Sequence, residues 1–192
     1  MDVEVQPATL DRFDDVAAIL GPAEGKPHGC WCLYYRLSSG EFNRVQGEER
    51  PVHVRDLCAG DQAPGVIAYR GSEPVGWCAF GPWSDMGRLQ RSRTIPRIDE
   101  RPRWSIVCFV VRAGYRRQGV AAALLEGAIE YATASGVDLL EAYPAETEGG
   151  RISASLAYVG TTSMFERAGF QRIQETSSRT GGRARWVMRL EL

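Results

Sequence analysis

One stretch near the middle of the chain constrains its fold most: an apolar segment, a glycine-containing turn, and a second apolar segment of different period. Residues 104–111 (WSIVCFVV) are β-branched and aromatic, without Pro or Gly, which predicts a strand. From Val120 to about Ser135 the apolar residues recur at helical spacing, and Gly136 supplies a stop. Gly119, just before that helix, lets the backbone approach a ligand closely. A strand, a turn and a helix are therefore expected in succession.

The predicted turn is suited to an anion. The first amide groups of a helix have no partner within the helix and lie at the positive end of its dipole. Arg116 and Arg117 precede the turn and add positive charge. The stretch has neither Gly-x-Gly-x-x-Gly nor Lys-Ser/Thr after its glycine, which excludes the dinucleotide fingerprint and the P-loop. A pyrophosphate is the predicted ligand.

The remaining patterns extend this unit into one domain over residues 1–192. Hydrophobic alternation predicts further strands at 2–6, 65–69, 74–80, 137–143, 170–175 and 184–190. Helices are predicted at 9–20, around 51–59 and at 153–168. Residues 137–143 should run parallel to 104–111 because a helix crosses between them. The fold class is therefore α/β (α+β), with a central mixed, mostly antiparallel sheet flanked by helices.

The spacing Arg116-x-x-Gly119-x-Ala121 after a hydrophobic strand resembles the acetyl-CoA signature of the GNAT (Gcn5-related) N-acetyltransferase superfamily. The order of elements and the motif at 164–170 (MFERAGF) are similar to that family as well. The resemblance implies the GNAT fold, in which two parallel strands splay apart, and acetyl-CoA as cosubstrate. It also implies cofactor-binding residues at the strand end and in the loop, namely Phe109, Val110, Val111, Arg116, Arg117, Gln118, Gly119, Val120, Ala121 and Ala122.

Two positions depart from the family's pattern. The tyrosine that often reprotonates the CoA thiolate is Phe165 here, and the usual upstream asparagine is Tyr158. On a continuous helix Tyr158 would lie two turns before Phe165 and on the same face. Tyr158 is therefore a candidate replacement for the proton donor, and packing against the sheet is the alternative.

Transfer of an acetyl group to an amine requires a base for the amine and a donor for the oxyanion. In the resembled fold these groups lie near the ends of the two parallel strands. Glu141 is the candidate base, with an ion pair to an arginine as its alternative, and Glu146 and Asp85 are weaker candidates. The amide of Val111, or that of Val110, is the candidate oxyanion donor. Cys108 is expected to be an inert core thiol.

Acceptor recognition in the resembled fold comes from the segment after the first strand and from loops beside the splay. Trp31, Tyr34 and Trp83 are predicted to line an aromatic pocket, in which Asp85 attracts a cationic amine; core packing is the alternative. The expected function is acetylation of a primary amine on a small molecule within a ternary complex. Acetylation of a protein or peptide, and an acyl-CoA-binding sensor without chemistry, remain as alternatives.

Composition argues against several other partners. The net charge is −1, and the arginine-rich segment 88–103 lacks interleaved aromatic residues, so no nucleic-acid partner is expected. No apolar run has membrane-spanning length and no leader is apparent, so a cytoplasmic monomer or homodimer is expected. Cys30 and Cys32 are one residue apart, not two, and no second Cys/His pair follows, so no metal site is predicted.

Overall fold

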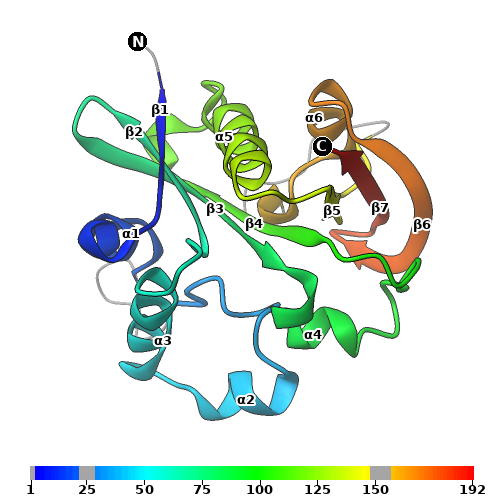
Figure 1. Cartoon of the computed structure of the whole chain (residues 1–192), viewed down its shortest axis with the longest axis horizontal. Coiled ribbons are helices and arrows are strands. Elements are labelled where there is room, and N and C mark those ends of the chain that lie inside the picture. Colours follow the sequence, from blue (N-terminus) through cyan, green and yellow to red (C-terminus); the bar gives the residue numbers. More distant parts are fainter. Residues whose placement is uncertain (1–2, 22–28, 148–156) are drawn as a thin grey trace.

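The computed structural model describes residues 3–21, 29–147 and 157–192, and in these ranges one sheet of seven strands carries helices on both faces (Figure 1). The sheet order is β1-β2-β3-β4-β5-β7-β6, and only β4 and β5 pair in parallel. This confirms the predicted mixed, mostly antiparallel sheet. The strands are β1 (Glu4–Pro7), β2 (Gly65–Arg70), β3 (Glu73–Pro82), β4 (Trp104–Val111), β5 (Leu139–Ala142), β6 (Gln171–Thr180) and β7 (Arg183–Glu191).

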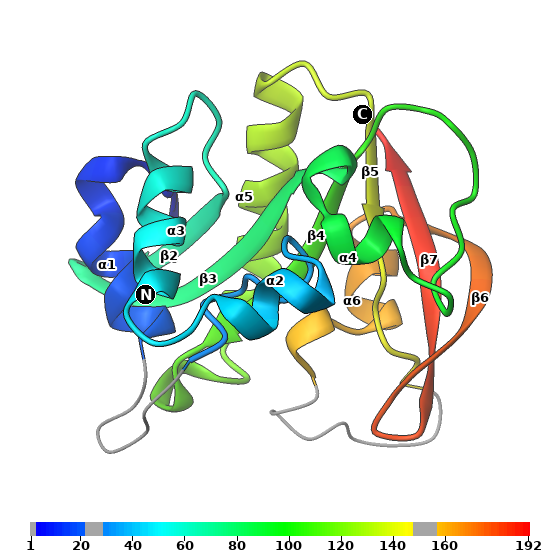
Figure 2. The same ribbon diagram turned by 90° about the horizontal axis from the view of Figure 1, so that it is seen from below.

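The helices divide between the two faces of the sheet (Figure 2). Alternate residues of β3 show the division: Trp77 packs with α1 and α3, and Cys78 packs with α5. In the described residues no helix is long and apolar enough to cross a membrane. The helices are α1 (Phe13–Leu20), α2 (Ser39–Arg44), α3 (Glu49–Cys58), α4 (Gly87–Gln90), α5 (Val120–Ala134) and α6 (Thr162–Arg167), and the 3-10 turns are η1 (Leu10–Arg12), η2 (Trp83–Asp85), η3 (Ala113–Tyr115) and η4 (Ala157–Val159).

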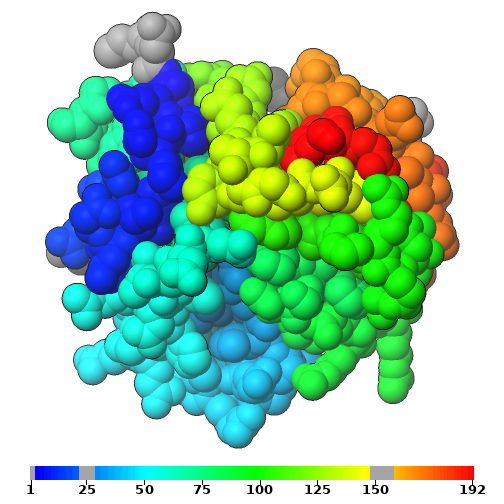
Figure 3. All heavy atoms as spheres, in the orientation of Figure 1, coloured from blue at the N-terminus to red at the C-terminus, as the bar shows by residue number. Residues whose placement is uncertain are grey.

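The long connection between β3 and β4 folds back onto the other end of the sheet. Its last part lies beside the end of β7, where Arg101 forms an ion pair with Glu191 at 2.6 Å (Figure 3). This connection contains η2 and α4, which hydropathy did not predict because both are very short. The helix α2 was also missed, although Ser38 and Glu41 form a capping box at its start.

The parallel pair of strands diverges at a β-bulge in β4. Pairing with β5 ends at Ile106, which lies opposite Ala142. On the other side of β4, Cys108 lies opposite Ala79 and Ile106 lies opposite Phe80, so Val107 has no partner in β3. An extra residue in one strand bends it and increases its twist. Beyond Val107, β4 therefore continues without a described strand on its β5 side.

The helix predicted at 153–168 is interrupted in its described part. After η4 the chain passes through Gly160, whose φ of +74° is left-handed, and α6 begins only after the N-cap Thr161, whose side chain accepts a hydrogen bond from the Met164 amide. Residues 153–156 lie outside the described ranges. The prediction that Tyr158 and Phe165 share a helix face is wrong, because Gly160 ends the first turn between them.

Candidate active site

The turn before α5 contains backbone amides without a hydrogen-bond partner in the helix. Gly119 is the N-cap residue with a φ of +83°, and a Cβ there would meet no atom within 4 Å. The first helical hydrogen bond runs from the Ala123 amide to the Gly119 carbonyl, at 3.0 Å. The amides of Val120, Ala121 and Ala122 therefore have no acceptor in the helix, and no side chain caps them. This corner of the molecule is open, as an anion site requires.

Two side chains of the predicted loop hold the loop itself. The Arg116 Nε donates to the Val111 carbonyl at 3.0 Å, and the Gln118 Nε2 donates to the Gly114 carbonyl at 2.8 Å. Arg70, on β2, donates to the Gln118 side chain at 2.6 Å; sequence reasoning missed this residue because it lies far away in the chain. Arg117 is exposed and has a φ of +60°. Arg116 and Arg117 are both exposed, and neither pairs with an acidic side chain among the described residues, so both contribute positive charge at this turn.

The ladder between β3 and β4 shows which amides of β4 face the open side. The Arg112 amide donates to the Val75 carbonyl at 3.0 Å. Hydrogen-bonded pairs alternate in an antiparallel ladder, so the amide of Val110, two residues earlier, also points to β3. The amides of Phe109 and Val111 therefore point away from β3, to the edge that β5 has left. Of the two amides suggested by sequence, that of Val111 is available and that of Val110 is not.

A cavity of about 380 Å³ lies on the α1 face beside this part of β4. It brings together three aromatic residues that the sequence singled out, Trp31, Tyr34 and Tyr158, with Val110 of β4. Burial, and then the neighbouring Tyr35, raise the pKa of Tyr158 well above its ordinary value of 10.0. Tyr158 therefore keeps its proton at neutral pH, and its hydroxyl lies at the cavity as a hydrogen-bond donor. Phe165, by contrast, is fully buried and packs edge-to-face on Phe109 and Phe170.

Three cysteines also line this cavity: Cys30, Cys32 and Cys108. The Sγ atoms of Cys32 and Cys108 are 3.1 Å apart, and this contact, together with burial, raises the pKa of the Cys32 thiol. Trp31 and Cys32 both have positive φ values, 51° and 54°. In the described ranges no group of three or more His, Cys, Asp or Glu side chains is placed to hold a metal ion.

The predicted contributions of Trp83 and Asp85 are corrected by the structure. Trp83 lies under two guanidinium groups, those of Arg97 at 4.8 Å and Arg103 at 4.4 Å from its ring centroid. Asp85 is exposed, and neither residue lines the cavity beside β4 or the smaller one of about 210 Å³ next to it. Among the described residues no carboxylate lines either cavity, so Asp85 does not provide the attraction for a cationic amine that was expected of it.

The prediction that Glu141 is the catalytic base is corrected as well. Its Oε1 accepts hydrogen bonds from Arg103 Nε at 3.1 Å and from the Tyr143 hydroxyl at 2.7 Å, and its Oε2 accepts one from Arg189 Nε at 2.7 Å. The residue is 0% exposed and lines neither cavity. Both of its carboxylate oxygens are occupied by these donors, so Glu141 does not reach an amine in either cavity. The alternative considered for it, an ion pair, is correct, although the pair is buried. The weaker candidate Glu146 pairs with Arg172.

Comparisons with known proteins agree with this geometry. The family model described as the Acetyltransferase (GNAT) family matches residues 16–153. A GNAT-family acetyltransferase from Streptococcus pneumoniae has 16% identity and a TM-score of 0.55, covering 100% of this chain and 99% of that one. The PaiA N-acetyltransferase from Thermoplasma acidophilum, solved with coenzyme A, has 11% identity and a TM-score of 0.53, covering 100% of both chains.

A third solved structure, a ribosomal-protein-alanine N-acetyltransferase from Brucella melitensis, has 18% identity and a TM-score of 0.55, covering 98% of this chain and 99% of that one. No curated protein matches the chain significantly. At these identities the structural likeness concerns the fold, and the family assignment rests on the family model.

The ion pairs of Glu141 predict a loss of stability in Glu141→Gln. Removing this charge leaves Arg103 and Arg189 buried without full compensation, which should lower the free energy of unfolding by about 3 kcal/mol. Urea denaturation measures the change, and Glu126→Gln, at an exposed position of α5, is the control. A Glu141→Gln protein as stable as the control would contradict the role assigned here.

The ion pair of Asp99 with Arg189 predicts that part of the free energy of unfolding is lost at low pH. The hydrogen bonds from Arg189, at 2.5 and 3.1 Å, lower the pKa of Asp99 from 3.8 to about 2. Because the folded pKa is the lower one, this stabilisation is complete above about pH 4 and is lost as the pH falls through about 2. Urea denaturation of wild type and Asp99→Asn should therefore show a difference at about pH 5 that shrinks toward about pH 2. A difference independent of pH would contradict the assignment.

Proposed function

The chain belongs to the acetyltransferase (GNAT) family, and on that basis we propose that it acetylates a primary amine of a small molecule, using acetyl-CoA within a ternary complex. One observation carries this proposal: the open turn at Gly119, the unpaired edge of β4 and the aromatic cavity follow one another along a single strand. Together they provide an anion site, a backbone edge and an acceptor pocket in the order that a thioester cosubstrate requires.

The residues of the turn fit the pyrophosphate of acetyl-CoA. The amides of Val120, Ala121 and Ala122 can donate to its oxygens, and the absent Cβ of Gly119 leaves room for it. Arg116 and Arg117 add positive charge. From there the pantetheine arm can run along β4, where the Val111 amide faces the open edge. The arm thus occupies the side of β4 where β5 no longer pairs with it.

The thioester would lie deeper along the same edge, nearer the bulge at Val107. There we assign the amide of Phe109 as the oxyanion donor and leave the Val111 amide to the arm, because Phe109 is two residues nearer to the point where the strands separate. The neutral amine attacks the thioester carbon, the carbon–sulfur bond breaks, and Tyr158 protonates the leaving thiolate. Among the described residues no carboxylate or imidazole lines the cavity, and we assign the removal of the amine proton to water, which also returns a proton to the Tyr158 oxygen.

The dimensions of the pocket favour a small acceptor over a protein. The cavity of about 380 Å³ is of the size that holds a small molecule, and the one of about 210 Å³ beside it adds room for a further group. Acetylation of a protein chain requires an open groove along which a peptide can lie. The position of Tyr158 in the cavity also favours an enzyme over a sensor, because it places a proton donor beside β4 although Phe165 is unable to serve.

The assignment of the pyrophosphate site predicts how substitutions of Gly119 affect acetyl-CoA binding. Gly119→Glu places a negative charge beside the phosphates and should raise the dissociation constant at least about 10-fold. Gly119→Ala is the matched control, since it shares the strain of a left-handed φ but not the charge. Calorimetric titration with acetyl-CoA measures both. Equal affinities of Gly119→Glu and the wild type would place the cosubstrate elsewhere.

The role of Tyr158 predicts a loss of turnover without a loss of binding. Tyr158→Phe should lower kcat about 100-fold while the dissociation constant of acetyl-CoA stays near the wild-type value. Because burial raises the pKa of Tyr158 above 10.0, the wild-type rate should not decline as the pH rises from about 7 to about 10. Release of CoA with a panel of amines measures the rate, and Tyr131→Phe, on α5, is the control. Unchanged turnover in Tyr158→Phe would remove it as the donor.

A further inference from the structure

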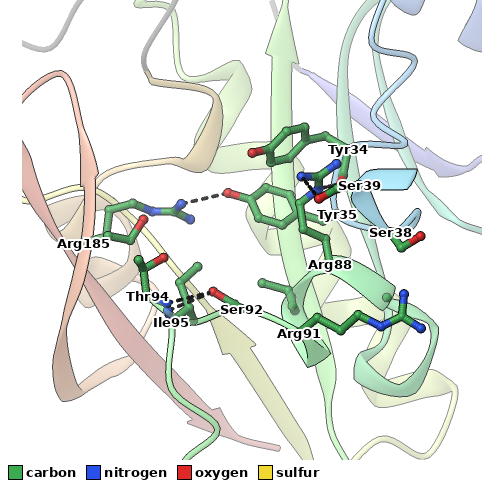
Figure 4. Close-up of a pocket in the computed structure, with 13 residues that line it drawn as sticks. Tyr34, Tyr35, Ser38, Ser39, Arg88, Arg91, Ser92, Thr94, Ile95 and Arg185 are labelled. Atoms are coloured by element: carbon green, nitrogen blue, oxygen red, sulfur yellow. Dashed lines mark hydrogen bonds between the residues drawn. The ribbon is translucent and has the colours of Figure 1, made fainter. Parts of the chain in front are cut away.

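The smaller cavity, of about 210 Å³, has a lining of a different character from the one beside β4 (Figure 4). Three arginines line it, Arg88, Arg91 and Arg185, together with the hydroxyl groups of several serines and a threonine. Cations and hydroxyl donors without a carboxylate form the kind of lining that binds an anion. The cavity shares Tyr34 and Tyr35 with the larger one, so the two cavities are adjacent.

Arg185, on β7, is a buried cation without an acidic partner. It is 4% exposed, and it donates from Nε to the Tyr143 carbonyl and from Nη1 to the Tyr35 hydroxyl, both at 2.8 Å. No carboxylate of the described residues lies within ion-pair distance of it. The other two arginines of comparable burial, Arg103 and Arg189, both pair with Glu141. A guanidinium keeps its charge in a protein, so an uncompensated one is costly to bury unless a ligand supplies the anion.

Arg88 provides a second cation on the opposite wall. Its Nε donates to the Tyr34 carbonyl at 2.6 Å and its Nη1 to the Ser39 hydroxyl at 2.9 Å, and its guanidinium lies 4.0 Å from the centroid of the Tyr34 ring. These contacts fix the guanidinium at the cavity without neutralising it, because none of its partners is an acid. Arg88 and Arg185 thus line the same cavity from two different parts of the fold. In Figure 4 the Arg185 guanidinium points to the Tyr35 hydroxyl, and that of Arg88 points to Tyr34 and Ser39.

Resting on the proposed function, the geometry points to an acceptor that carries an anionic group, a carboxylate or a phosphate, on the same small molecule as its amine. The anion binds Arg185 and Arg88, and the amine extends past Tyr35 to the cavity where Tyr158 and the open edge of β4 lie. An amine without an anion gains nothing from these arginines. The anionic group therefore determines which amines are acetylated and orients them toward the thioester.

The test compares amines that differ only in the anionic group. Initial rates of CoA release are measured with phenylalanine against 2-phenylethylamine, 4-aminobutyrate against butylamine, and O-phosphoethanolamine against ethanolamine. The wild type should favour the anionic member of at least one pair about 10-fold or more in kcat/KM. A carboxylate-bearing and a phosphate-bearing substrate are distinguished by the pair that shows the preference.

Arg185→Gln and Arg88→Gln should each lower that preference about 10-fold, mainly through KM, and Arg185→Lys should restore part of it. The preference is the ratio of two kcat/KM values measured with the same variant, so a general loss of activity cancels from it. Arg88→Gln tests the inference even where Arg185→Gln folds poorly. Arg93→Gln, at an exposed position that lines neither cavity, is the charge-matched control.

Two results overturn the inference while the proposed function stands. In the first, neutral amines or a peptide N-terminus are acetylated at rates equal to those of the anionic amines. In the second, the preference for anionic amines is unchanged in both variants. A protein that binds acetyl-CoA but neither binds nor acetylates any anionic amine overturns it as well. Absence of acetyl-CoA binding in calorimetry instead contradicts the proposed function itself.

Discussion

The arrangement of the candidate site depends on one irregularity, the extra residue in β4 at Val107. Up to Ile106, β4 is held by neighbours on both sides, and beyond Val107 it keeps only β3. The change of twist that accompanies a bulge separates β4 from β5 and exposes the amides of Phe109 and Val111. Without it, a regular parallel pair would satisfy those amides, and the cavity beside them would have no reactive edge. The openness of the site is therefore a property of strand pairing.

Buried charge provides a second level of organisation. Under the β4–β5 pair, Glu141 and Asp99 are matched by Arg103 and Arg189, which leaves this cluster electrically balanced. Arg103 also covers one face of Trp83. The balance explains why Glu141 is better suited to hold the strands together than to accept protons. It also distinguishes Arg185 from Arg103 and Arg189, which are about as buried and both pair with Glu141.

The parts of the fold that the sequence predicted well are those governed by local patterns. The strand at 104–111 and the helix from Val120 follow from an uninterrupted apolar run and a helical period, and both agree with the structure within a residue. The open turn at Gly119 followed from the same pattern. Short elements such as α4 were missed because a single turn of helix has no measurable period.

The catalytic and acceptor assignments were less predictable because they depend on which distant residues meet. Trp83 and Asp85 directly follow β3 in sequence but lie outside both cavities. Tyr35 and Cys108, which are far apart in the chain, line the same one. Arg185 carries no signal in sequence, since an arginine in an alternating strand usually faces solvent. By itself the sequence determined the strand, the glycine turn and the helix around Gly119, because adjacent residues dictate them. Only the tertiary structure decided which carboxylates are neutralised and which cation is left for a ligand, because burial and pairing are set by residues brought together from across the chain.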